Sequence, residues 1–171
     1  MHDNQKQAQD INLAYISGII DGEGTFMISK STHGYKRVTP SYCARIRVRM
    51  SEPDSLKFIY DKTKLGIFKY LGVRKDRPAH HKHQYSWEIH SNDCLIFIKM
   101  IEPFLVLKKP QLNLMKEFLL NFKKTVFPRG KVPSNELAIR EDAYFKMRVL
   151  NGKQAAATTK SQSTGDGEAI V

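Results

Sequence analysis

Hydrophobic residues along this chain recur with two different periods, which divide it into expected helices and strands. Apolar residues spaced three and four apart predict helices over about 13–24, 53–65, 92–102, 110–124 and 134–150. Alternating apolar and polar residues predict strands over about 25–31, 42–51, 67–74 and 82–90. This order predicts an α+β fold class, an αββαββα core with one four-stranded antiparallel sheet backed by helices.

The two ends of the chain lack these patterns. Residues 1–9 are polar and are expected to fray, with Asp10 or Asn12 capping the first helix. Residues 153–171 are small, polar and almost free of aromatic side chains, which is typical of disorder. We therefore expect a single domain over residues 1–150 and a disordered tail over residues 151–171.

The charge balance is the most unusual property of the composition. The chain has 28 Lys and Arg residues against 17 Asp and Glu, a net charge of +11, which favours a polyanionic partner, with nucleic acid ahead of a membrane. No apolar run approaches the ~20 residues of a membrane span, and the first residues form no apolar signal region. Cys43 and Cys94 lack metal spacing and are expected to be buried thiols. An intracellular protein is expected, and an organelle and a prokaryotic cytoplasm both fit.

The strand over residues 42–51 carries the strongest binding signal. Arg45, Arg47 and Arg49 alternate with apolar residues and therefore share one face. A structural role for three like charges would need acids opposite them, and Glu88 is the only acid on the polar face of the neighbouring expected strands. A twisted antiparallel ribbon fits the DNA major groove, where Arg reads guanine in bidentate fashion. The alternative is a solvated polar face, which normally mixes both signs of charge.

Other residues on this face, or in the turns beside it, extend the expected DNA-binding surface. Candidates for contact with base edges are Thr25, Ser29, Ser31, His33, Gln84 and Ser86, and Met27 and Glu88 lie on the same face. Positive charge is added by Lys36, Arg37, Lys69, Arg74, Lys75 and Arg77, some of it for phosphates. The histidine-rich turn over residues 80–83 lacks acid or cysteine partners at ligand spacing, so phosphate contact is favoured there over metal binding.

The first helix ends in two carboxylates interleaved with glycines. Ala14, Gly18 and Gly22 recur every four residues, so they form a stripe along which another backbone can approach closely. Asp21 and Glu23 lie at the C-terminal end, where the helix dipole disfavours carboxylates, and this suggests a cation site. The alternative is a core helix that ends in a glycine cap and an acidic turn.

Residues 16–24 read ISGIIDGEG, which closely resembles the signature of the LAGLIDADG homing endonucleases. The departures include Ile16 for the first Leu, Ser17 for the first Ala and Glu23 for the second Asp, and Glu23 still supplies a carboxylate. Residues 102–111, EPFLVLKKPQ, resemble the segment of single-motif members from which a lysine enters the cleavage pocket, and Lys108 matches that lysine. Glu52 matches a polar position that organises water near the scissile phosphate. Leu56 stands where many members have a basic residue, with Lys57 beside it.

The resemblance implies a homodimeric, site-specific endonuclease that cuts a long, pseudo-palindromic DNA duplex. Two copies of the first helix would pack along Ala14, Gly18 and Gly22, below a saddle formed by two sheets. The resemblance assigns Mg²⁺ to Glu23, aided by the Gly22 carbonyl, while Asp21 is assigned to helix-end structure, with metal binding as the less favoured role. Two alternatives are an RNA-binding cofactor of intron splicing, for which intron RNA is the partner, and a catalytically inactive DNA-binding protein.

Overall fold

Five helices and four strands make up the part of the chain that the computed structural model describes, residues 2–32, 39–72, 83–121 and 131–152. In chain order they are α1 (His2–Glu23), β1 (Gly24–Ser31), β2 (Ser41–Met50), α2 (Asp54–Thr63), β3 (Ile67–Gly72), β4 (Gln84–His90), α3 (Asn92–Ile101), α4 (Lys109–Asn121) and α5 (Ser134–Leu150). The periodicities of the sequence therefore predicted the type and order of these elements correctly, and the α+β fold class is confirmed.

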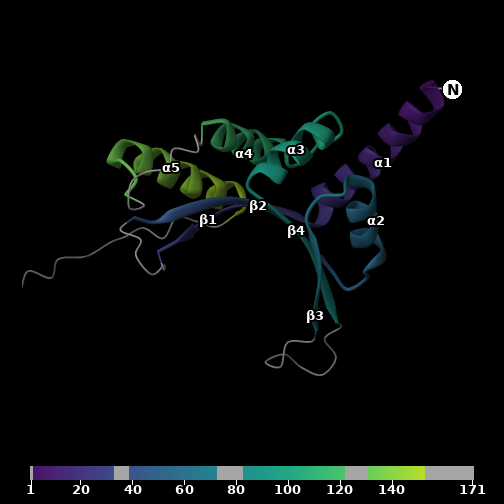
Figure 1. Cartoon of the computed structure of the whole chain (residues 1–171), viewed down its shortest axis with the longest axis horizontal. Coiled ribbons are helices and arrows are strands. Elements are labelled where there is room, and N and C mark those ends of the chain that lie inside the picture. Colours follow the sequence, from purple (N-terminus) through teal and green to yellow (C-terminus); the bar gives the residue numbers. More distant parts are fainter. Residues whose placement is uncertain (1, 33–38, 73–82, 122–130, 153–171) are drawn as a thin grey trace, which may run out of the picture.

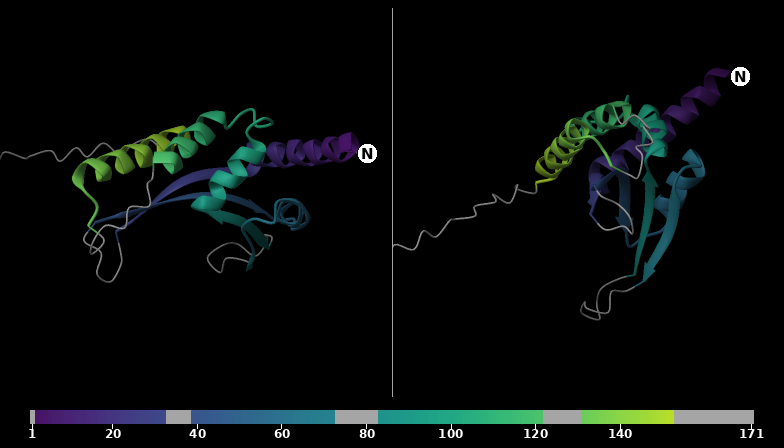
Figure 2. Two further views of the ribbon diagram at one scale, coloured as in Figure 1. Left: turned by 45° about the horizontal axis from the view of Figure 1, so that its top comes forward. Right: turned by 60° about the vertical axis from the view of Figure 1, so that its left-hand side comes forward.

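The four strands form one antiparallel sheet in the order β1-β2-β4-β3. The sheet is strongly curved: β1 and β2 extend to one side, while β4 and β3 turn downward (Figure 1). Helices α3, α4 and α5 lie on one face of the sheet, and α2 lies beside β3 and β4 (Figure 2). In β1 and β2 buried residues alternate with half-exposed ones, so one face of these strands packs into the core and the arginine-bearing face is open.

The core lies between the sheet and the helices. Trp87 of β4 is fully buried, packs on Phe97 of α3 with ring centroids 5.1 Å apart, and donates its indole N–H to the Leu65 carbonyl (2.9 Å). α1 contributes Ile16 and Ile20, both without exposed surface. Other fully buried large side chains include Phe26, Ile46, Leu56, Ile59, Ile89, Ile98, Ile101 and Leu105.

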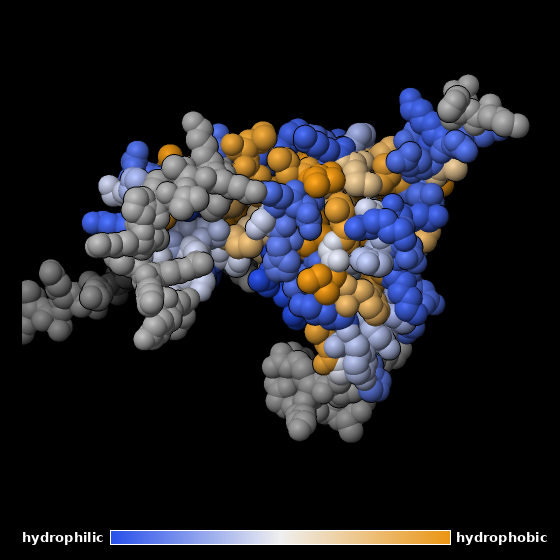
Figure 3. All heavy atoms as spheres, in the orientation of Figure 1, coloured by the Kyte–Doolittle hydropathy of each residue, from blue (hydrophilic) through white to orange (hydrophobic). Residues whose placement is uncertain are grey.

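The N-terminal half of α1 differs from the expectation of a frayed end. The helix begins at His2, and Asp10 and Asn12 lie inside it instead of capping it. Its first turns project away from the rest of the fold (Figure 1), and residues 4–9 are exposed and mostly polar (Figure 3). Residues 4–9 contain no glycine or proline and include Ala, Gln and Lys, which favour helix, so nothing local interrupts the helical conformation. None of the described helices is long and apolar enough to cross a membrane.

The transition from α1 to β1 depends on a close approach of two backbones. A Cβ atom on Gly24 would lie 2.5 Å from the Ile20 carbonyl oxygen and 2.9 Å from the Ile20 Cα. Only glycine fits there without moving the backbone. Gly24 therefore lets β1 start directly at the end of α1, and this fixes where the acidic end of the helix lies relative to the sheet.

Ser91 and Ser134 lie where a serine could cap a helix, but neither side chain does so. Ser91 precedes α3 at the N-cap position, but its side chain makes no capping hydrogen bond. Ser134 is the first residue of α5, and Pro133 occupies the N-cap.

Candidate cleavage site and nucleic-acid interface

Glu23, the last residue of α1, is exposed, and β1 follows immediately. Gly22 beside it is also exposed. Because the last carbonyl groups of a helix have no intrahelical partner, this end of α1 presents oxygen atoms together with a carboxylate. Such a concentration of negative charge attracts cations.

Asp21 has a different environment from Glu23. Its carboxylate accepts hydrogen bonds from the backbone N–H groups of Val106 (2.8 Å), Leu107 (3.1 Å) and Lys108 (2.9 Å). These groups precede α4, so Asp21 joins the end of α1 to the start of α4. The carboxylate is occupied by backbone donors, which agrees with its expected role in helix-end structure.

Lys108 reaches back to the end of α1. Its Nζ donates to the carbonyl oxygens of Ile20 (3.0 Å), Gly22 (3.4 Å) and Gly24 (2.6 Å). Burial lowers the pKa of the Lys108 ammonium, and the negative charges of Asp21 and Glu23 act in the opposite direction. Lys108 therefore lies at the same end of α1 as Glu23, the acid to which the family resemblance assigned the metal.

Glu52 follows β2 and is exposed. Leu56, at the position where many members of the family have a basic residue, is fully buried in the core. The adjacent Lys57 is exposed and forms an ion pair with Asp54 (3.3 Å). Within the residues that the structure describes, no group of three or more His, Cys, Asp or Glu side chains could hold a metal ion. At the end of α1, one copy of the chain thus offers the Glu23 carboxylate together with backbone carbonyl oxygens.

The stripe of small residues on α1 is open to solvent. Ala14, Gly18 and Gly22 are exposed, and a Cβ atom added to either glycine would meet no atom within 4 Å. Val106 and Leu107, whose N–H groups bind Asp21 near the end of this helix, are 70% and 73% exposed. This surface has the small and apolar residues that close helix packing uses.

The polar face of the sheet carries the expected arginines in its central strand. Arg45 and Arg47 are half-buried and Arg49 is exposed. The register places Met27 and Thr25 of β1 opposite Arg45 and Arg47, and His90, Glu88 and Ser86 of β4 opposite Arg45, Arg47 and Arg49. The outer strand β3 adds the exposed Lys69 opposite Ser86.

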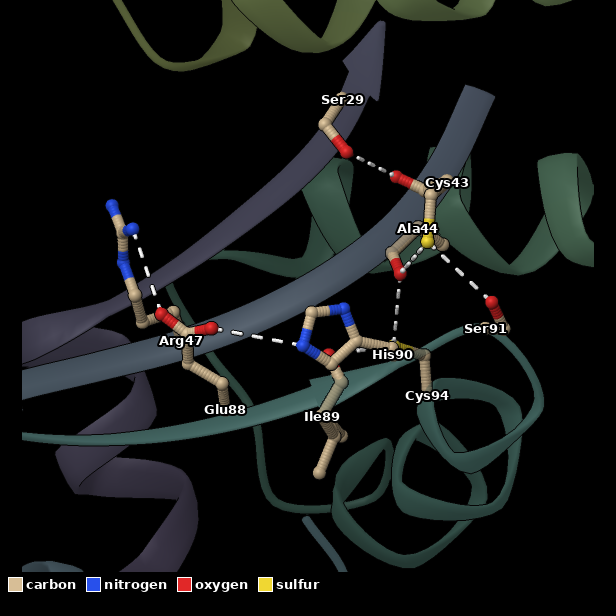
Figure 4. Close-up of polar contacts among 9 residues, drawn as sticks. All are labelled: Ser29, Cys43, Ala44, Arg47, Glu88, Ile89, His90, Ser91 and Cys94. Carbon is tan, nitrogen blue, oxygen red and sulfur yellow. Dashed lines mark hydrogen bonds and ion pairs between the residues drawn. The ribbon is translucent and has the colours of Figure 1, made fainter. Parts of the chain in front are cut away.

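Glu88 links two of these side chains (Figure 4). Its carboxylate lies 3.7 Å from Arg47 Nη1 and 3.6 Å from His90 Nε2. Burial, followed by the charge of Arg49, lowers the pKa of Arg47, while Glu88 raises it. Burial and the nearby Arg45 lower the pKa of the His90 imidazole.

Several predicted contact residues have surroundings that the sequence pattern could not indicate. Ser86 has no exposed surface, so in this structure it is not available to a base edge; its cross-strand neighbours are Arg49 and Lys69. Cys43 is half-exposed on the polar face and not buried, whereas Cys94 is buried as expected. Thr25, Met27 and Ser29 are half-exposed, and Ser31 and Gln84 are exposed. His33, Lys36, Arg37, Arg74, Lys75, Arg77 and most of the 151–171 tail lie outside the described residues.

Further residues on the polar face, among them His90 and Ile67, were not among the predicted contacts. His90 lies opposite Arg45, and Ile67 of β3 lies opposite Glu88 and is exposed. The alternation in β4 already put His90 on the face of Gln84, Ser86 and Glu88. Its significance follows only from the 3.6 Å contact of its Nε2 with the Glu88 carboxylate, which depends on side-chain positions.

Comparison with solved structures identifies the fold. The chain is similar to the homing endonuclease I-CvuI in complex with its target in the presence of Ca, with a TM-score of 0.64 and 12% identity over 96% of this chain and 89% of that chain. It is also similar to the homing endonuclease I-TnaI, with a TM-score of 0.60 and 16% identity over 82% of this chain and 94% of that chain.

A third similar structure is the LAGLIDADG homing endonuclease I-GzeII in complex with a DNA target, with a TM-score of 0.57 and 15% identity over 80% of this chain and 43% of that chain. No protein-family model and no curated protein matches the sequence. The chain therefore has the fold of the LAGLIDADG homing endonucleases, as the motif at residues 16–24 indicated.

Proposed function

We propose that this protein is a site-specific DNA endonuclease that cuts a long, pseudo-palindromic duplex as a homodimer, using Mg²⁺. The main support is the meeting of Glu23 and Lys108 at the end of α1, where Lys108 Nζ donates to the Gly22 carbonyl (3.4 Å). An acid and a lysine from segments more than 80 residues apart are brought together there. The polar, arginine-bearing face of the same sheet supplies a surface for the duplex.

The donor atoms at this site suit Mg²⁺. Carboxylate and carbonyl oxygens are hard ligands, and Mg²⁺ binds through one or two carboxylates together with substrate phosphates. A carbonyl oxygen has two lone pairs, so Gly22 can accept Lys108 and still serve as a ligand. Glu23 is exposed and free to face a second copy of the chain. Bound there, the ion would activate water and stabilise the leaving 3′-oxygen.

Each residue of the site would then have a separate role in cleavage or in DNA binding. Glu23 and the Gly22 carbonyl hold the metal, and the Lys108 ammonium offsets the negative charge that develops on the phosphate. Glu52, exposed just beyond β2, orients water near the scissile bond. The arginines of β2, with Lys69, Gln84 and the polar residues of β1, contact the major groove.

In the proposed homodimer, the exposed stripe of small residues on α1 packs against the same stripe of a second copy of the chain. Gly18→Leu should prevent two α1 helices from approaching, because the leucine side chain would fill the space between them, while the open surroundings of Gly18 leave the single chain undisturbed. We expect a folded monomer by sedimentation and circular dichroism, with cleavage reduced by at least about 100-fold.

The matched control for Gly18→Leu is Lys6→Leu, at an exposed position on the projecting part of α1. It should leave the dimer intact. A wild-type chain that is monomeric and fully active would contradict the dimer.

The proposed activity is tested by incubating the protein with a randomised duplex library, with Mg²⁺ or with a chelator. Selective cutting of a small set of related duplexes, only with Mg²⁺, is the expected result. Binding should weaken steeply with salt, because many phosphates are contacted. Sequence-selective binding without cutting would instead favour an inactive DNA-binding protein. Tight binding to a structured intron RNA that competitor duplex does not reduce would favour the splicing cofactor.

A further inference from the structure

Glu88 lies at the centre of the arginine-bearing face and is nevertheless only 8% exposed. It pairs directly with Arg47 across β2 and β4 and with Ile67 across β4 and β3. One carboxylate oxygen faces Arg47 and the other faces His90 (Figure 4). Both oxygens are therefore directed at neighbouring side chains of the protein.

The groups around this carboxylate are mainly cationic. Arg45 and Arg49 flank Arg47 on β2, and Lys69 of β3 lies on the same face. Like charges so close together repel, and a single buried carboxylate among them offsets part of that repulsion. A long arginine side chain without such a partner loses more conformational entropy when it is fixed in one direction.

We propose that Glu88 is a positioning residue for DNA recognition, which fixes the direction of the Arg47 guanidinium without reading a base itself. This inference rests on the proposed DNA-binding function. A guanidinium has five N–H donors, so Arg47 can face Glu88 with one edge and still present two donors to guanine O6 and N7. The carboxylate, with one oxygen directed at Arg47 and the other at His90, has little accessible surface with which to accept a hydrogen bond from cytosine.

The flanking Arg49 provides an internal contrast. It is exposed, and its cross-strand partner is Ser86 instead of an acid. Arg49 therefore has no fixed carboxylate beside it in the β2–β4 register, and a mobile arginine suits contact with phosphates more than readout of one base. Glu88 thus gives Arg47 a fixed direction that Arg49, opposite Ser86, does not share.

The test compares Glu88→Gln, Glu88→Asp and Arg47→Gln in binding to a randomised duplex library without divalent metal, so that no duplex is cut. Glu88→Gln should lose roughly 10-fold discrimination at one base pair of each half-site, the size of one bidentate contact. Arg47→Gln should lose discrimination at the same base pair, and the double variant should lose no more than Arg47→Gln alone. Affinity for non-specific duplex should stay equal or rise in Glu88→Gln, because a negative charge is removed. Glu88→Asp, which keeps the charge, should retain part of the discrimination.

The control is Asp61→Asn, which removes the same charge from an exposed position on α2. It should leave the base preference unchanged. A wild-type preference that survives Glu88→Gln at every position would overturn the positioning role alone. So would losses at different base pairs in Glu88→Gln and Arg47→Gln, because Glu88 would then read its own base. A wild-type chain with no base preference would contradict the proposed function itself.

Discussion

Glu23→Gln is expected to abolish Mg²⁺-dependent cutting while the duplex is still bound. The amide keeps the size of the side chain but loses the charge that holds a divalent cation, so the cleavage rate should fall on the order of 10³-fold or more, about 4 kcal/mol in activation free energy. Glu23 is exposed at the end of α1, so the fold should not suffer. The measurement is single-turnover cleavage of a selected duplex together with a binding titration.

Asp10→Asn is the matched control, because it removes an equal charge from the same helix two turns or more before the site. It should cut at the wild-type rate. Undiminished cleavage by Glu23→Gln would move the metal site away from the end of α1. Loss of binding along with cleavage would mean that Glu23 supports the interface and not the chemistry.

Lys108→Met is expected to lower both cleavage and stability. The ammonium donates to three carbonyl oxygens at 3.0, 3.4 and 2.6 Å, and these lose a charged donor in the variant. The free energy of unfolding should fall by about 1–3 kcal/mol. Cleavage should fall on the order of 10²-fold, because no positive charge then offsets that of the reacting phosphate. Urea unfolding and single-turnover cleavage separate the two effects.

The role of Lys108 can also be tested through the pH dependence of cleavage and of stability. Burial lowers its pKa below the usual 10.5, so cleavage by the wild type should decline at an alkaline pH below that value, as the ammonium loses its proton. Between the folded and unfolded pKa values the unfolded chain binds more protons, so this group makes stability rise with pH across the same window. Activity and the lysine's contribution to stability therefore change in opposite directions.

The adjacent Lys109 is exposed and begins α4, so Lys109→Met serves as the control for both measurements. It should retain the cleavage rate, the alkaline decline and the unfolding free energy of the wild type. If Lys108→Met cuts at the wild-type rate with the same alkaline decline, another group carries the charge that the reaction needs.

The sequence predicted which residues share the polar face of the sheet, but not how exposed each of them is. Alternation along β2 placed Arg45, Arg47 and Arg49 on one face, because successive side chains of a strand point to opposite sides. The same rule placed Ser86 and Glu88 on that face but could not indicate how deeply they are buried. Burial depends on which long side chains lie opposite, and that is a property of register between strands.

The acidic end of α1 could be recognised as a candidate site in the sequence because its motif is local. The spacing of Ala14, Gly18 and Gly22, and the carboxylates that follow, are contained within a dozen residues. The start of the helix at His2 was not predicted, because polar residues without a periodic apolar face give no signal even where nothing interrupts the helix.

The sequence by itself determined the type and order of the elements, the polar and apolar faces of the strands, and the motif that indicates the fold. These depend on periodicity and on short spacings, which a single chain displays without its folded structure. Only the tertiary structure decided that Asp21 binds the backbone before α4, that Lys108 reaches the end of α1 and that Glu88 is shared by Arg47 and His90. Asp21 and Lys108 make contacts across more than 80 residues of sequence, and the contacts of Glu88 depend on strand register and side-chain direction. The acid and the lysine lie together at the end of α1 because packing brings these distant segments into contact.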